Sequence, residues 1–250
     1  PTTASKRPAQ QTASKPILVD LGLPSGTKWA DRNIGATSVT SVGGYYSYGE
    51  TATKQMYTSD TYTFKSDITN IAGTEYDVAT KKYGKGWSIP TAEQWKELFE
   101  SCTLDYMVIN KRYVAKFTGP NGKSIYLYFP PNDIYARVGN MEMSKQISAK
   151  LMAFITENET FVNLSQLAQY NGMTVKATEA IYRTANKESL AQILAIISVE
   201  KNGKVNPSLK NATVQNSDQA IYGILVRPVF NSPKTESTED TEQDEIELPE

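Results

Sequence analysis

The chain has 250 residues, enough for one large domain or two small ones. Hydrophobic residues make up 39% and charged residues 21%, which is ordinary for a soluble globular protein, and no apolar run is long enough to span a bilayer. The absence of histidine excludes Ser–His–Asp and Cys–His catalysis and removes the usual ligand of catalytic zinc. The single cysteine, Cys102, excludes an internal disulfide.

Charge is distributed unevenly along the chain, although the formal net charge is only −1. Residues 235–250 hold eight acidic residues and no basic ones, so removing them leaves 19 acidic against 26 basic residues. We expect residues 233–250 to form a disordered acidic tail that aids solubility or docks onto a basic partner or the chain's own basic face. Residues 1–16, rich in Thr, Ser, Ala, Gln, Pro and Lys, are expected to be a flexible tether after a processed or lipid-anchored N-terminus.

The first predicted elements are short strands and turns. Residues 17–23 alternate loosely and lead into a Gly-Leu-Pro-Ser-Gly turn, and residues 27–30 form a second short strand. A tyrosine cluster at 45–48, bounded by glycines, is typical of another strand, and residues 77–83 favour a short helix.

The clearest helix begins after Pro90. This proline fixes its own φ and restrains Ile89 to an extended conformation. Thr91 can cap the first turn, and Gln94 can reach back to close a capping box. The apolar face that follows at helical spacing consists of Trp95, Leu98, Phe99 and Cys102. On this face Cys102 is expected to be a buried, inert thiol.

A β-hairpin is predicted over 113–117 and 124–129. Asn121-Gly122 lies between these two apolar and aromatic runs, which is a strong hairpin signal. A short strand over 106–109 precedes the hairpin.

The stretch 140–200 changes character. Ile147, Leu151, Phe154 and Ile155 follow helical spacing within 141–157. Three further helices are predicted over 164–171, 174–184 and 189–199. The sequence therefore predicts a mainly helical insertion whose two ends return to neighbouring strands.

Four ordered blocks resemble a known family. They are Val-Asp-Leu-Gly-Leu-Pro-Ser-Gly-Thr-Lys-Trp-Ala at 19–30 with Asn-Ile-Gly-Ala at 33–36, Gly-Tyr-Tyr-Ser-Tyr-Gly-Glu-Thr at 44–51, Gly-Trp-Ser-Ile-Pro-Thr-Ala-Glu-Gln-Trp at 86–95, and Tyr-Gly-Ile-Leu-Val-Arg-Pro-Val at 222–229. In these blocks the chain resembles the Fibrobacter succinogenes major paralogous domain, common in surface proteins of the Bacteroidetes–Fibrobacteres group. The resemblance covers residues 17–131 and 218–230. It implies a variant of the C-type-lectin-like fold that formylglycine-generating enzymes also use.

The expected fold class is therefore α+β: a C-type-lectin-like domain of short strands and one capped helix, interrupted by an α-helical insertion. The domain would comprise residues 17–133 and a closing strand within 218–232, around an insertion over 134–217. Formylglycine-generating enzymes use a pair of cysteines, so their chemistry does not carry over to a chain with Cys102 alone. No enzymatic activity is expected.

The candidate ligand-binding residues follow from the same resemblance, because loops before the closing strand make much of the ligand contact in that fold. The chain has 15 tyrosines, a residue type suited to binding faces. The aromatic residues of the matching blocks are interpreted instead as core; they are Trp29, Trp87, Trp95, Tyr46 and Tyr48. The candidates for ligand contact are Asn132, Asp133, Tyr135 and Arg137.

No metal and no cofactor are expected. Asn132-Asp133 resembles the motifs that bind Ca²⁺ and sugar hydroxyls in true C-type lectins. Calcium, however, needs six to eight oxygen ligands, and the sequence offers no dense acidic loop. Glu93 and Glu97 lie on the polar side of the capped helix and are interpreted as solvated residues.

A helix-turn-helix is an alternative interpretation of 164–187. Ala168 and Gly172 have the spacing of that motif, and Lys176, Arg183 and Lys187 would lie on or beyond its second helix. The modest basic charge favours a plain helical hairpin instead, so nucleic acid is not expected as a partner.

The sequence predicts a non-catalytic, surface-displayed binding or adhesion module that recognises a glycan or a protein. The alternative is a structural or assembly protein, for example a phage virion decoration or docking subunit, that uses the insertion as its interface. The expected location is extracellular or at the cell surface, with the phage virion as the alternative.

Overall fold

The computed structural model describes residues 15–109, 112–129, 174–199 and 205–231, and every structural statement below concerns these residues. The helical elements are the 3-10 turn η1 (Ser59–Thr61), α1 (Val78–Tyr83) and α2 (Ala92–Ser101). The strands before residue 130 are β1 (Leu18–Asp20), β2 (Lys28–Ala30), β3 (Tyr45–Tyr46), β4 (Trp87–Ser88), β5 (Thr103–Ile109), β6 (Arg112–Thr118) and β7 (Ser124–Tyr128). The later strands are β8 (Thr174–Arg183), β9 (Ser189–Val199), β10 (Val205–Asn216), β11 (Ile224–Leu225) and β12 (Val229–Phe230).

The expected fold class, an α+β domain interrupted by an α-helical insertion, is wrong. The structure is mostly β, with three sheets and only two short α-helices in the described part of the chain. The helices predicted over 174–184 and 189–199 are the long strands β8 and β9, and β10 follows them. The helices predicted over 141–157 and 164–171 lie outside the described residues.

The physical reason for this error lies in the position of β9. It is the middle strand of three, with β8 on one side and β10 on the other. A middle strand can bury apolar side chains on both faces, so its sequence loses the alternation that marks a half-buried strand. The apolar run 193–197 therefore fits a helical pattern and a buried strand equally well.

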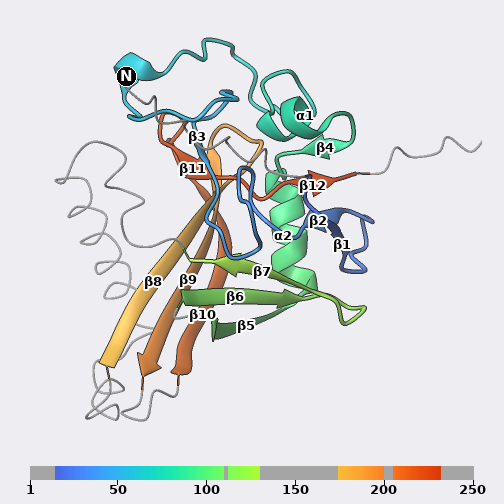
Figure 1. Cartoon of the computed structure of the whole chain (residues 1–250), viewed down its shortest axis with the longest axis vertical. Helices are drawn as coiled ribbons and strands as arrows, with labels where there is room; N and C mark the ends of the chain where they lie inside the picture. The colour runs from blue at the N-terminus through green and yellow to red at the C-terminus, as the bar shows by residue number, and fades with distance from the viewer. Residues whose placement is uncertain (1–14, 110–111, 130–173, 200–204, 232–250) are drawn as a thin grey trace, which may run out of the picture.

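The three sheets surround helix α2. Their strand orders are β1-β2-β12-β4, β10-β9-β8-β11-β3 and β5-β6-β7. Figure 1 shows α1 and β4 near the upper end of α2, and the β5–β7 sheet near its lower end. In the first sheet Val229 of β12 lies opposite both Trp29 of β2 and Ser88 of β4. The opening, central and closing blocks of the sequence thus form one sheet.

The apolar face of α2 is the centre of the main core. Trp95 is fully buried, with its ring centroid 4.7 Å from that of Trp29 at an interplanar angle of 66°, and 5.4 Å from that of Tyr182 on β8. Phe99 packs at 5.6 Å against Phe117 of β6. One helical face therefore contacts all three sheets.

The local predictions for α2 and the hairpin are confirmed. The Thr91 hydroxyl accepts the Gln94 N–H at 3.3 Å, and the Gln94 side-chain oxygen accepts the Thr91 N–H at 3.0 Å, which completes the capping box. Strands β6 and β7 pair in antiparallel register from Val114 opposite Tyr128 to Thr118 opposite Ser124. Both elements could be predicted from the sequence because the interactions that define them, the capping box and the tight turn, join residues close together in the chain.

Helix α1 is fixed by the buried carboxylate of Asp77. One oxygen accepts the N–H groups of Ala79 at 2.8 Å and Thr80 at 3.3 Å, which caps the helix. The other accepts the N–H groups of Gly73 at 3.0 Å and Ile89 at 2.9 Å. This one side chain thus joins the preceding loop, the helix and the residue that follows β4.

We expect Asp77→Ala to destabilise the protein by about 3 kcal/mol, because it removes a helix cap and leaves buried N–H groups without acceptors. Asp77→Asn, which keeps one oxygen, should cost less. Glu75→Ala removes an exposed carboxylate two residues away and serves as the matched control. Urea unfolding measures all three; equal stability of the Asp77→Ala and Glu75→Ala variants would show that the four hydrogen bonds do not matter.

Candidate functional site

The predicted ligand residues Asn132, Asp133, Tyr135 and Arg137 all lie outside the described residues, so they stay predictions. The chain approaches them from Phe129, which is buried with its ring 5.9 Å from that of Tyr106. The Tyr182 hydroxyl of β8 donates to the Tyr128 carbonyl at 3.4 Å. The chain therefore leaves β7 from a fixed point beside β8.

The aromatic residues of the matching blocks form the core, as expected. Trp29, Trp87, Trp95, Tyr46 and Tyr48 each have at most 2% of their surface exposed. Within the described residues seven tyrosines are buried and therefore belong to the core rather than to a binding face: Tyr45, Tyr46, Tyr48, Tyr57, Tyr106, Tyr128 and Tyr182.

Arg183 is a buried cation that the sequence analysis placed on a DNA-reading helix. It lies instead at the end of strand β8, so the helix-turn-helix interpretation is wrong there. Its guanidinium donates to the carbonyls of Gln219 at 3.2 Å, Tyr222 at 2.7 Å and Tyr46 at 3.4 Å. Burial lowers the pKa of Arg183 to about 10, which leaves it charged at neutral pH.

Arg227 plays a similar part in the closing block. Its guanidinium donates to the Asn33 side-chain oxygen at 2.8 Å, the Ala30 carbonyl at 3.0 Å and the Tyr126 carbonyl at 2.8 Å. Burial lowers its pKa from the ordinary value. Both guanidinium groups donate hydrogen bonds to backbone and side-chain oxygens of separate segments and so hold these segments together. Their burial was not detectable in the sequence, since arginine is usually exposed.

Glu50 and Lys54 form a second charged centre that sequence reasoning missed. The Glu50 carboxylate pairs with the Lys54 ammonium and accepts the N–H and hydroxyl of Thr63 at 2.8 and 2.7 Å. Lys54 also lies 5.8 Å from the centroid of the Tyr62 ring. Burial alone would raise the pKa of Glu50, but the hydrogen bonds from Lys54 and Thr63 outweigh it and hold the pKa below its ordinary value.

The remaining candidate reactive groups are Cys102 and the two carboxylates on the polar side of α2. Cys102 is buried, and burial raises the pKa of its thiol to about 11, which confirms the expected inert thiol. Glu97 is partly exposed, and its carboxylate accepts the Ser25 N–H at 2.8 Å and the Ser25 hydroxyl at 2.6 Å. Glu93 is exposed, as expected.

No cluster of three or more His, Cys, Asp or Glu side chains that could hold a metal ion occurs in the described part of the chain. Neither α-helix there has the length and apolar character that crossing a bilayer requires.

The most distinctive surface feature is an arm of three strands, β8, β9 and β10. These strands have 10, 11 and 12 residues, whereas no other strand in the described ranges exceeds seven. Their far ends lie beyond the β5–β7 sheet (Figure 1). Near the core, Ala180 and Tyr182 point inward and are buried. Ile181, between them, is paired with Gln192 and belongs to a half-exposed row.

The comparisons with known proteins identify no relative: no family model, no curated protein and no solved structure matches this chain.

We expect Glu50→Gln to destabilise the protein by about 2 kcal/mol at neutral pH, because it removes charge-assisted hydrogen bonds. The folded-state pKa of Glu50 lies below the unfolded value of about 4.3. Its carboxylate therefore stabilises the fold above that pH, and the contribution is lost as the pH falls through the folded-state pKa. Urea unfolding over a pH series should show the gap between the two proteins closing in acid.

Glu100→Gln makes the same chemical change at an exposed position of α2 and should alter neutral-pH stability by less than about 0.5 kcal/mol. A gap for Glu50→Gln that stays constant or widens in acid would contradict the assignment of a lowered pKa.

Proposed function

We propose that the protein is a non-catalytic binding or adhesion module, displayed outside the cell, whose ligand is a glycan or a protein. The observation that carries the proposal is that the buried charged side chains and the cysteine stabilise the fold. Within the described residues, Arg183, Arg227, Glu50 and Asp77 are each bound to groups of the scaffold, and Cys102 is buried. The Glu50 carboxylate is paired with Lys54 and bound by Thr63, and the other charged groups bind backbone or amide atoms, so each is used in holding the fold together.

The convergence of the four matching blocks also supports the proposal. Residues of the blocks that are up to 200 positions apart in sequence pack together in two clusters. Trp29, Trp95 and Val229 share the cluster that includes α2, and Tyr46 and Trp87 share a second cluster. The aromatic residues of the blocks are core residues, as the sequence predicted, although the expected fold class is wrong.

Ligand contact is assigned to Asn132, Asp133, Tyr135 and Arg137. Amide and carboxylate groups can bind sugar hydroxyls or backbone groups, and a tyrosine ring can stack on an apolar face of a sugar or a side chain. The described chain fixes the start of this segment at Phe129, beside β8.

Paired substitutions test this assignment in the full chain. We expect Asn132→Ala/Asp133→Ala and Tyr135→Ala/Arg137→Ala each to weaken binding at least ten-fold, equivalent to about 1.4 kcal/mol. The probes are an immobilised panel of cell-surface glycans and a set of purified surface proteins, and thermal unfolding shows whether the fold is intact. The change should appear in affinity and leave the melting temperature unchanged.

Lys65→Ala/Glu75→Ala, at two exposed positions elsewhere, is the control and should bind as the wild type does. Equal binding by all three variants, or no binding to either panel by the wild type, would overturn the proposed function.

A second candidate function is structural assembly, and the arm favours it. Long, laterally paired strands that extend past the core offer a surface for a second subunit, as a virion decoration or docking protein needs. If copies of this chain associate through the arm, sedimentation velocity should show oligomers that grow with concentration. The double variant Ile181→Lys/Thr213→Lys, on the half-exposed row of the arm, should then be monomeric. A wild type that stays monomeric at every concentration would exclude self-assembly.

A further inference from the structure

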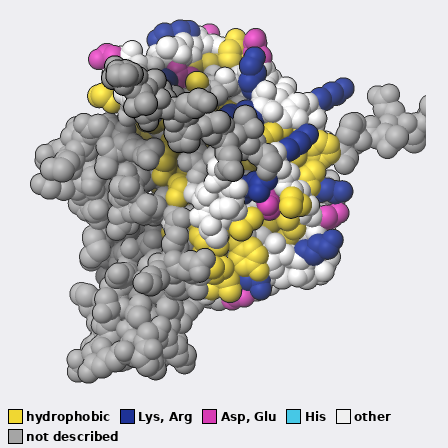
Figure 2. All heavy atoms as spheres, viewed as in Figure 1, with side chains coloured by type: hydrophobic (Ala, Val, Ile, Leu, Met, Phe, Trp, Pro, Cys, Tyr) yellow, Lys and Arg dark blue, Asp and Glu magenta, His cyan; other side chains and the backbone are white. Residues whose placement is uncertain are grey.

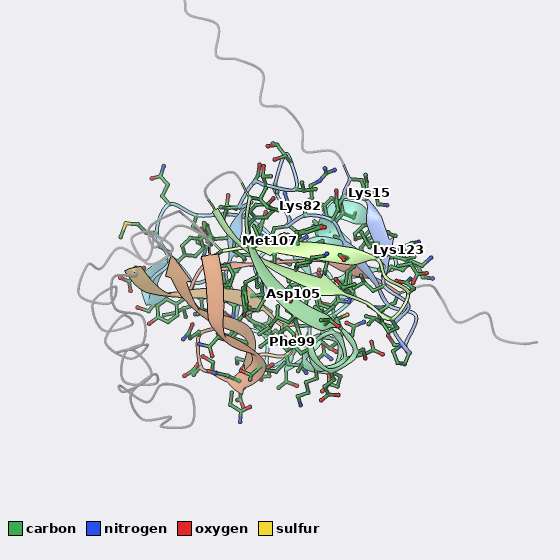
Figure 3. The ribbon with its side chains drawn as sticks, turned by 90° about the horizontal axis from the view of Figure 1, so that it is seen from below. Lys15, Lys82, Phe99, Asp105, Met107 and Lys123 are labelled. Carbon is green, nitrogen blue, oxygen red and sulfur yellow. The ribbon has the colours of Figure 1, made fainter. Side chains whose placement is uncertain are left out.

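A group of five cationic side chains lies at the end of the molecule that carries α1. We define the basic surface as Lys15, Arg32, Lys81, Lys82 and Lys85. In Figure 2 dark blue side chains gather along the right-hand side of the visible face, where Figure 1 places α1, β12, β1 and β2. Figure 3 shows Lys15 and Lys82 on the same side of the molecule.

Specific contacts bring these cations together from separate segments. The Lys15 ammonium donates to the Tyr83 carbonyl at 3.1 Å and lies 5.2 Å from the centroid of the Trp87 ring. Arg32 donates to the Lys15 carbonyl at 3.0 Å. The segment before β1, the loop after β2 and the end of α1 are thereby held side by side.

Asp31 pairs with Arg32 and neutralises its charge, whereas no ion pair within the described residues involves the exposed lysines of α1. Asp31 is 3.7 Å from Arg32 and accepts the Ile17 N–H through its other oxygen. Asp77, which precedes α1, is buried and bound by four N–H groups. Lys81, Lys82 and Lys85 are exposed at or just beyond the C-terminal end of α1, where the helix dipole favours cations. The basic surface therefore presents a net positive charge to solvent.

The closing strand leads the chain directly to this surface. The Asn231 N–H donates to the Gly86 carbonyl at 2.9 Å, and Gly86 follows Lys85 in the chain. The Phe230 ring packs 5.7 Å from that of Trp87. The last described residue is thus fixed beside the basic surface, on the side where Lys85 lies.

The sequence that follows is the most acidic part of the chain. Residues 235–250 carry eight carboxylates and no cation. The first, Glu236, is five residues after Asn231, a distance of at most about 18 Å for an extended chain. The acidic residues therefore have the opposite charge to the basic surface, and the connection to Asn231 is short enough for them to reach it.

We propose that the acidic segment 235–250 docks on the basic surface of its own chain and covers it. Each exposed ion pair contributes only about 0.2–1 kcal/mol, so several must act together. Attachment at Asn231 raises the effective concentration of the carboxylates to about the millimolar range, which lets weak pairs suffice. An anionic partner of the basic surface would have to displace the segment first.

Paramagnetic relaxation in the full chain tests the contact. A nitroxide is attached to the Gln243→Cys variant; Cys102 is buried with its pKa raised to about 11, so the reagent labels the introduced thiol. At low salt we expect broadening of the backbone amide signals of Lys81, Lys82 and Lys85. The amides of Leu104 and Asp105 in β5, at the other end of the described structure, should stay sharp.

Two charge-reversal variants carrying the same label separate specific docking from general attraction. Lys81→Glu/Lys85→Glu should abolish the broadening at α1, whereas Lys65→Glu/Lys96→Glu, with the same change in net charge, should retain it. Salt near 1 M, where the Debye length is about 3 Å, should also abolish it. The proposal is overturned if α1 is not broadened in the labelled wild-type background, or if the two charge-reversal variants behave alike.

Discussion

The structure depends on one constraint: a single ten-residue helix must fit three sheets at once. Trp95 contacts Trp29 of the first sheet and Tyr182 of the second, and its indole N–H donates to the Arg183 carbonyl at 3.4 Å. Phe99, one turn on, contacts Phe117 of the third sheet. Interiors are packed nearly as densely as organic crystals, so a change in any of these rings is transmitted to all three sheets.

The buried arginines also join separate parts of the structure, by hydrogen bonds to buried carbonyl groups that apolar side chains could not satisfy. Loops that end in the interior bring carbonyl groups with them, and each buried carbonyl needs a donor. Arg183 supplies several donors to the segment 219–222 and to β3, while Arg227 joins β2, the following loop and β7. The planar guanidinium suits this use because it remains charged and presents its donors in a fixed arrangement. The Arg183 Nε group, buried with no acceptor among the described residues, shows that this arrangement leaves a desolvation cost.

An element could be predicted from the sequence when the residues that determine it lie close together in the chain. The capping box of α2 and the Asn-Gly hairpin involve neighbours within a few residues, and both were predicted correctly. Strands β8 and β9 depend on pairing across a sheet, and the apolar run 193–197 of β9 fits the spacing of a helix as well as that of a strand. Arg183 and Glu50 were missed for a similar reason, because their partners Tyr222 and Thr63 are specified only by the tertiary structure. The core role of the tryptophans was predicted from the family resemblance of the blocks in which they lie, and their burial confirms it.

The distribution of charge follows from the same architecture. The Asp77 carboxylate beside α1 is buried and bound by four N–H groups, so it does not face the solvent near the lysines of that helix. The most acidic part of the sequence, residues 235–250, follows β12, which pairs with β2 and β4. Because β12 is held between two strands of the opening and central blocks, the chain leaves the domain at a fixed place and in a fixed direction. The packing of the core therefore sets where the last described residue, Asn231, lies relative to the basic surface.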